Sequence, residues 1–240
     1  MVPFFYPLLS EMCFFCQNYV ISHLGEGDEI TDKQVADIMV SLQRQGCHNI
    51  NLVTPSHVVP QILAALPRAI DQGLSIPLVY NSSGYDFVET LKLLRGVIDL
   101  YLPDYKFWQE ESAKRFAKAP DYPEIARAAL SEMYRQVGSL LIDRCGIAEK
   151  GLLVRHLAMP DGIDESRKIL NFLAREISLD TYVNIMDQYR PSGLAKEYPL
   201  IDRSLASGEY ENAMQCAMDA GLTRLDKRDW SGFLRQLGII

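Results

Sequence analysis

The sequence has few cysteines and no long apolar run, and both absences narrow the class of protein. Its 240 residues include five cysteines, an odd number that does not suggest a disulfide framework, and only Cys13 and Cys16 lie close together. The apolar start, residues 1–9, lacks a basic segment before it and is too short to cross a bilayer. We therefore expect a cytoplasmic protein whose close cysteine pair has a metal or redox role.

Positive charge is also scarce. The chain has 24 Lys and Arg residues against 31 Asp and Glu residues, a formal net charge of −7, and no dense basic run. Such a surface is not drawn to nucleic-acid phosphates or to anionic lipid, so we expect neither a nucleic acid nor a membrane as partner. The content of 48% hydrophobic and 23% charged residues is that of an ordinary globular protein.

Low-complexity segments, internal repeats and linkers are absent, which indicates one domain over residues 1–240. Within it, residues 221–240 are predicted to form a C-terminal tail that packs on the body through Trp230, Phe233 and Leu237.

Short apolar runs alternate with helical patterns along the chain. The runs predicted as strands are residues 4–8, 49–53, 77–80, 97–102, 151–157 and 181–186. The helices are predicted at residues 32–45, 60–72 and 85–94, from an Asp121 cap with Pro123 in the first turn, and at 163–176 and 209–220. This alternation implies parallel βαβ units, in either a doubly wound sheet or an open barrel. In both, the site lies at the carboxyl ends of the strands.

Polar residues occur at the end of every predicted strand, but the loops that follow strands are polar in most proteins. This observation alone leaves a functional and a purely structural interpretation open. The polar segments are residues 13–18, 54–57, 81–84, 104–106, 155–156 and 187–190.

The segment Cys13-Phe14-Phe15-Cys16-Gln17-Asn18-Tyr19 resembles the cluster loop of the radical S-adenosylmethionine (radical SAM) superfamily. The resemblance is to the branch of pyruvate formate-lyase activating-enzyme-like iron–sulfur proteins, whose C-x-x-x-C-x-x-C motif is usually followed by Gln-Asn-Tyr. Five further segments resemble that branch in the same order, at residues 49–57, 78–84, 101–106, 151–156 and 186–191. The resemblance implies an incomplete (β/α)6 TIM-like barrel.

The resemblance also implies a chemistry. Three thiolates hold three irons of a [4Fe–4S] cluster and leave the fourth iron to bind S-adenosylmethionine. In the family, the reduced cluster cleaves S-adenosylmethionine to a 5′-deoxyadenosyl radical, which abstracts a hydrogen atom. The resemblance therefore implies an oxidoreductase with these two cofactors, a protein substrate such as the backbone glycine of a glycyl radical enzyme, and an electron donor such as flavodoxin or ferredoxin.

The sequence departs from the motif at its first cysteine. Counting back from Cys16 and Cys13 places that cysteine at position 9, which is occupied by Leu9, and leucine cannot bind iron. The branch usually has a further cysteine-bearing segment before this loop. We therefore expect either a chain shortened at its start or a degenerate relative.

Site residues follow from the matched positions. Cys13 and Cys16 resemble the second and third cluster ligands, and Phe15 resembles the aromatic whose backbone meets the adenine. Thr54 and Ser56 stand where relatives carry a Gly-Gly-Glu turn for the methionine amino group, which this chain lacks.

Further matched positions are expected to contact S-adenosylmethionine. Asn81 and Ser83 match contacts to the ribose and methionine end, while Asp104 and Lys106 match an Asp-x-Lys that handles a cation and the methionine carboxylate. Arg155 matches an arginine of the fifth strand. The remaining expected contact, after the sixth strand, is Gln188.

Other interpretations remain open. Lys106 and Arg155 are of types that commonly form simple ion pairs, and His57 and His156 of a type that often satisfies local hydrogen bonds. The chain could be a degenerate, non-catalytic barrel that binds a nucleoside-like ligand or a protein partner. A zinc site of the cysteine pair with His23 or His57 is a third alternative, although a second closely spaced ligand pair is missing.

Overall fold

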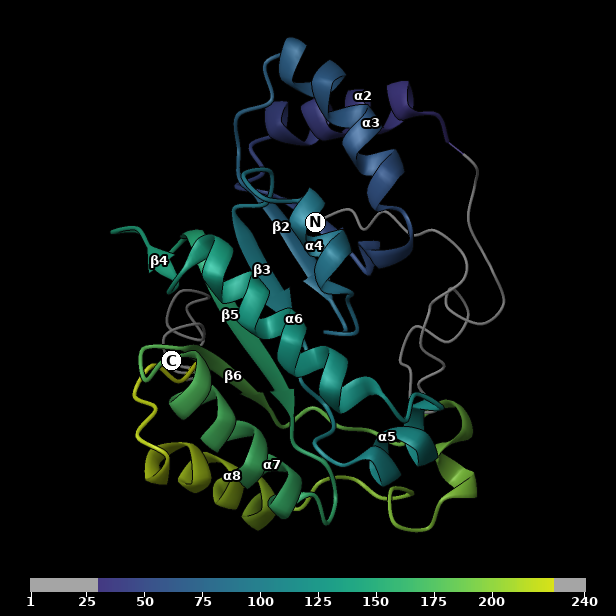
Figure 1. The fold of residues 1–240 in the computed structure, drawn as a ribbon, viewed down its shortest axis with the longest axis vertical. Helices are drawn as coiled ribbons and strands as arrows, with labels where there is room; N and C mark the ends of the chain where they lie inside the picture. Colours follow the sequence, from purple (N-terminus) through teal and green to yellow (C-terminus); the bar gives the residue numbers. More distant parts are fainter. Residues whose placement is uncertain (1–29, 227–240) are drawn as a thin grey trace, which may run out of the picture.

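Five parallel strands form the centre of the computed structural model, which describes residues 30–226 (Figure 1). They are β1 (Ile50–Val53), β2 (Leu78–Ser82), β3 (Leu100–Pro103), β5 (Ala148–Leu157) and β6 (Tyr182–Met186). Each pairs with the next in this order, so their carboxyl ends meet along one edge. Within the described residues β1 and β6 do not pair with each other, and the barrel is open.

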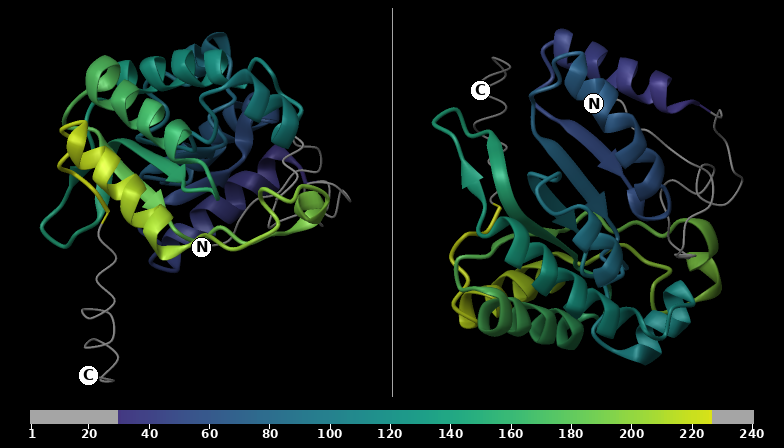
Figure 2. Two further views of the ribbon diagram at one scale, coloured as in Figure 1. Left: turned by 90° about the horizontal axis from the view of Figure 1, so that it is seen from below. Right: turned by 45° about the horizontal axis from the view of Figure 1, so that its top comes forward.

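Helices connect the strands and cover the outer face of the curved sheet (Figures 1 and 2). They are α2 (Asp32–Arg44), α3 (Val59–Asp71), α4 (Val88–Leu93), α5 (Glu110–Ala117), α6 (Tyr122–Val137), α7 (Ile163–Phe172) and α8 (Ser207–Asp219). The main apolar core lies between these helices and side chains of the outer face such as Leu52, Tyr80, Val154 and Ile185. A small second cluster on the opposite face includes Val79, Leu100 and Leu140. Among residues 30–226, no helix combines the length and apolarity needed to cross a membrane.

The predicted elements of residues 30–226 occur in the predicted order, and α5 is a helix that the sequence did not predict. The predicted strand at residues 4–8 lies outside the described residues. The structure adds β4 (Leu141–Ile142), which pairs antiparallel with the start of β5. Between them the Asp143 carboxylate accepts hydrogen bonds from the backbone N–H groups of Cys145 and Ile147, both at 2.8 Å, which closes the turn. The hairpin therefore extends β5 three residues before its predicted start.

One predicted cap is wrong in detail. Asp121 precedes α6 and Pro123 lies in its first turn, but the Asp121 side chain makes no capping hydrogen bond. Its carboxylate instead accepts a hydrogen bond from the Tyr85 hydroxyl at 2.8 Å. The cap at α2 is complete, because Thr31 and Gln34 form a reciprocal capping box.

The segment after α8 returns to the sheet. Val183 donates to the Arg224 carbonyl and Asp226 donates to the Val183 carbonyl, both at 2.9 Å, and Leu222 is buried. The part of the expected tail from residue 227 onward lies outside the described residues, so its packing stays a prediction.

Candidate functional site

The inner face of the sheet carries polar side chains toward its carboxyl edge. The pairing sets Arg155 beside Asn184, and a parallel bridge sets Asp104 beside Arg155. Because adjacent paired residues point to the same face and successive residues to opposite faces, these side chains lie away from the helices that bury Val154 and His156. The sheet therefore presents a polar row on its open side.

Arg155 joins the members of this row. Its Nη2 donates to Asn81 Oδ1 at 2.7 Å, and its Nε lies 2.7 Å from Asp104 Oδ1. Lys106 Nζ lies 3.3 Å from Asp104 Oδ2. The side chains of Asp104, Lys106 and Arg155 are only 15%, 14% and 25% exposed. We call these three residues, together with Asn81, the Arg155 cluster; its formal charge is +1.

Two atoms of the cluster keep hydrogen-bonding capacity. Asp104 Oδ1 and Arg155 Nε are buried, and although they form a close ion pair, neither has a well-aligned hydrogen bond within the described residues. A buried polar atom without such a bond is costly unless a further group completes it. The cluster is therefore suited to a small ligand that carries both charged and polar groups.

The loops that present the cluster are locked together by Tyr122. Its hydroxyl lies 2.9 Å from the Ser83 carbonyl and 3.2 Å from the Asp104 carbonyl, and it accepts a hydrogen bond from the Lys106 N–H at 2.9 Å. Gly84 passes so close that a Cβ there would lie 2.3 Å from the Asp104 carbonyl oxygen. The loops after β2 and β3 are therefore held in fixed contact.

The loop after β1 joins a different network. The Ser56 hydroxyl donates to Asp86 at 2.6 Å, and the same buried carboxylate accepts from Tyr80 at 2.7 Å and Ser82 at 2.6 Å. Burial, followed by the nearby Asp86 charge, raises the pKa of Tyr80. Thr54 contributes its backbone N–H to the Asn81 carbonyl at 2.7 Å. The structure thus places the Ser56 hydroxyl with Asp86, a residue that the sequence analysis did not single out.

The remaining predicted residues are placed separately. Ser83 Oγ accepts a hydrogen bond from the Tyr85 N–H at 3.4 Å. Gln188 follows β6 at the same edge, with its side-chain amide 3.4 Å from the Met186 sulfur. Leu9, Cys13, Phe15 and Cys16 lie outside the described residues. Within residues 30–226, no three His, Cys, Asp or Glu side chains are placed to hold a metal ion.

A cavity of about 520 Å³ adjoins the Arg155 cluster, and Lys106 lines it. Its walls come from α5, from the loop between β5 and α7, and from residues 200–201. His156, at its wall, is fully buried, and burial lowers its pKa. Because a carbonyl only accepts, His156 Nδ1 carries the proton donated to the Tyr105 carbonyl, and Nε2 accepts from the Ser166 hydroxyl, both at 2.8 Å. The sequence analysis did not predict this cavity.

Comparison with known proteins supports the fold more strongly than the chemistry. No family model matches the chain. An uncharacterised protein of Methanocaldococcus jannaschii is 34% identical over an alignment of 213 residues, and the match covers 85% of this chain. The chain spans only 58% of that relative's length.

Solved structures resemble the chain at low sequence identity. HydG, a maturase of the FeFe-hydrogenase, has a TM-score of 0.59 at 15% identity. The match covers 92% of this chain and 50% of the HydG chain. HydG from Carboxydothermus hydrogenoformans has a TM-score of 0.59 at 13% identity, and the match covers 99% of this chain and 57% of that HydG chain. The structure of anSMEcpe with bound AdoMet and a Kp18Cys peptide has a TM-score of 0.61 at 9% identity, and the match covers 98% of this chain and 66% of the anSMEcpe chain. These likenesses show the fold, and the predicted fold class is confirmed, with the barrel open.

Proposed function

We propose that this chain is a radical SAM protein of the pyruvate formate-lyase activating-enzyme-like branch, and that its Arg155 cluster binds S-adenosylmethionine. The observation that carries the proposal is the convergence of Asn81, Asp104, Lys106 and Arg155 at the carboxyl edge of the open sheet. Two of the solved structures that share the fold contain bound AdoMet. Binding at the carboxyl ends of parallel strands is the rule for such folds.

The residues of the cluster fit the polar end of this ligand. The methionine moiety is zwitterionic, with one carboxylate and one ammonium group. Arg155 and Lys106 would hold the carboxylate, Asp104 would accept from the ammonium group, and Asn81 would contact a hydroxyl of the ribose. The two buried atoms without aligned hydrogen bonds, on Asp104 and Arg155, would be completed by such contacts. When bound beside a reduced iron–sulfur cluster, S-adenosylmethionine supplies the chemistry of hydrogen-atom abstraction.

The iron–sulfur cluster is proposed from the sequence. Cys13 and Cys16 would supply two thiolates, and Leu9 stands where the motif has a third. A third ligand would then come from another residue or from a small thiol. By the same resemblance we propose a protein substrate, such as a glycine-bearing segment of a glycyl radical enzyme, and flavodoxin or ferredoxin as electron donor.

Leu9 also favours a second candidate, a barrel that keeps the ligand pocket after losing its cluster. Such a protein would bind a nucleoside-like molecule or a protein partner through the Arg155 cluster without cleaving anything. Tyr122 and Gly84, which position the Arg155 cluster, would support ligand binding equally well in such a barrel.

Anaerobic reconstitution with iron and sulfide separates these functions. The proposed enzyme binds iron and sulfide, becomes brown and forms 5′-deoxyadenosine from S-adenosylmethionine when reduced. A colourless protein that still binds S-adenosylmethionine indicates the cluster-free barrel, and stoichiometric zinc indicates a zinc site. Cys13→Ala should abolish iron binding, whereas Cys145→Ala, which removes an exposed free thiol, should not change it.

A further inference from the structure

We propose that the cavity beside Lys106 binds an organic anion with an apolar body, meaning a carboxylate or phosphate carried on a ring or chain. Its volume of about 520 Å³ lies in the range of small-molecule sites. Its role as the substrate pocket rests on the proposed function, because Lys106 belongs both to this cavity and to the Arg155 cluster.

The apolar part of the ligand has a suitable wall. Phe107 and Phe116 line the cavity, are themselves buried, and stack with ring centroids 6.2 Å apart. Leu157 and Met159, at the end of β5 and just after it, also line the cavity, as does Leu200, which is 47% exposed. A ring or short chain would therefore cover apolar surface that otherwise faces water.

Two of the three acidic groups in the lining are already occupied. The Glu165 carboxylate accepts hydrogen bonds from the backbone N–H groups of Trp108 and Gln109 and from the Ser112 hydroxyl. Asp161 Oδ1 lies 3.2 Å from Arg203 Nη2. Of the acidic side chains that line the cavity, this leaves Glu111 as the one with no described partner.

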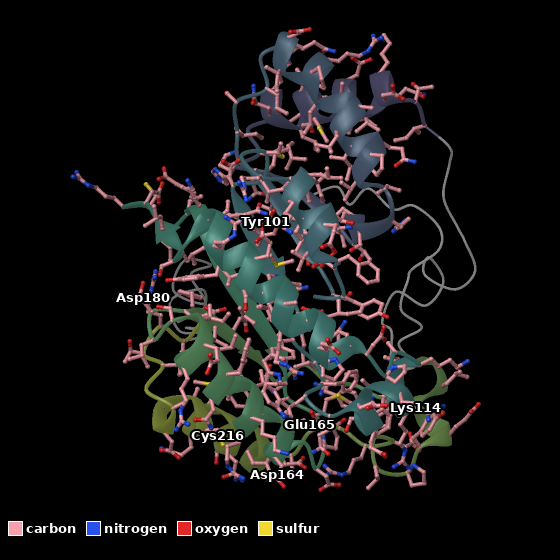
Figure 3. The ribbon with its side chains drawn as sticks, in the orientation of Figure 1. Tyr101, Lys114, Asp164, Glu165, Asp180 and Cys216 are labelled. Atoms are coloured by element: carbon pink, nitrogen blue, oxygen red, sulfur yellow. The ribbon has the colours of Figure 1, made fainter. Side chains whose placement is uncertain are left out.

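The basic groups of α5 are available. Lys114 and Arg115 line the cavity, are exposed, and form no ion pair with a described carboxylate. Arg115 lies over the Phe116 and Tyr198 rings, at 5.4 and 5.8 Å from their centroids, which holds its guanidinium in place. Figure 3 shows Lys114 on α5 and Glu165 on the neighbouring helix. Available cations beside an apolar wall favour an anionic, partly apolar ligand.

The test uses two probes with the same ring system. We would titrate the full chain by calorimetry with 1-naphthaleneacetate, which is anionic, and with 2-(1-naphthyl)ethanol, which is neutral. The anion should bind more tightly than the alcohol. Replacing both cations, in Lys114→Gln with Arg115→Gln, should lower the affinity for the anion roughly fivefold to tenfold and leave the affinity for the alcohol unchanged. The control, Lys92→Gln on α4 with Arg95→Gln just after that helix, removes the same charge outside the cavity and should change neither affinity.

A second variant tests the wall. Leu200→Trp should fill the cavity and weaken both probes. Absence of binding, equal affinity for the two probes, or unchanged affinity in the Lys114 and Arg115 double variant would overturn the inference. Titration of the same proteins with S-adenosylmethionine separates the two proposals. Binding of S-adenosylmethionine without the anion defeats the cavity site alone, whereas binding of the anion without S-adenosylmethionine supports the cavity site and defeats the proposed function.

Discussion

Arg155 Nε lies 2.7 Å from Asp104 Oδ1, and the two residues also form a parallel bridge between neighbouring segments of the sheet. The Tyr105 N–H donates to the Arg155 carbonyl at 2.8 Å, so the backbone as well as the side chains fixes this pair. The ion pair is therefore a consequence of the sheet register, and its polar atoms are presented to the open side in a fixed orientation.

The close approach of Gly84 to Asp104 should be essential. Gly84→Ala places a Cβ 2.3 Å from the Asp104 carbonyl oxygen at a φ of +81°, whereas Gly96→Ala has a similar φ of +77° and no atom within 4 Å. Both variants should lose about 1 kcal/mol because the left-handed conformation disfavours alanine. Only Gly84→Ala should lose about 2 kcal/mol more, because the backbone must shift. Urea unfolding measures both, and equal losses would show that the contact is not tight.

Glu165 should hold α5 against α7. Glu165→Ala removes the acceptor for two backbone N–H groups and for the Ser112 hydroxyl, and should lower the free energy of unfolding by about 2–3 kcal/mol. Asp164→Ala is the matched control, since its carboxylate is 70% exposed and, among residues 30–226, pairs only with Arg167 at the surface. It should change stability by less than about 0.5 kcal/mol. Similar losses in the free energy of unfolding for the two variants, measured by thermal or urea unfolding, would contradict the role of Glu165 in holding α5 against α7.

The buried imidazole of His156 should make stability depend on pH. Burial lowers its pKa in the folded state, so between that value and the ordinary value of about 6.5 the unfolded chain binds more protons. The free energy of unfolding should therefore fall as the pH is lowered through about 6.5, by at most about 1.4 kcal/mol per pH unit. Urea titrations between pH 7.5 and 5.5 measure this slope. His156→Gln should reduce it.

Leu9 should limit cluster assembly. It lies outside the described residues, and the motif has a thiolate at its position. Leu9→Cys should raise the iron content after anaerobic reconstitution and the yield of 5′-deoxyadenosine above those of the parent chain. Full activity in the parent would show that another group supplies the third ligand. Equal, near-zero yields in both proteins would favour the barrel without a cluster.

The sequence predicted the sheet well because its strands are apolar runs bounded by glycine, proline and polar residues. It also predicted a site at the carboxyl ends of the strands that includes Asn81, Asp104 and Arg155, and parallel pairing brings those residues together. The contact of Ser56 with Asp86 was not predictable, because the partner of a hydroxyl depends on how distant loops pack.

Helix α5 explains why the cavity was missed. Its sequence begins Glu110-Glu111-Ser112 and continues through Lys114 and Arg115, so its apolar pattern is reduced to Ala113, Phe116 and Ala117. A short helix with so few apolar positions gives little periodicity, and its N-terminus is held by Glu165 from another helix. That contact exists only in the folded chain, and the cavity depends on it.

Calorimetric titration with S-adenosylmethionine tests the central claim most directly. We expect the parent chain to bind it, and Asn81→Ala and Asp104→Ala each to weaken binding by about tenfold, since each removes a polar contact worth roughly 1.4 kcal/mol. Asp180→Ala, which removes an exposed carboxylate paired with Arg224, should leave the affinity unchanged. Absence of binding by the parent, or unchanged affinity in both cluster variants, would contradict the assignment of the Arg155 cluster.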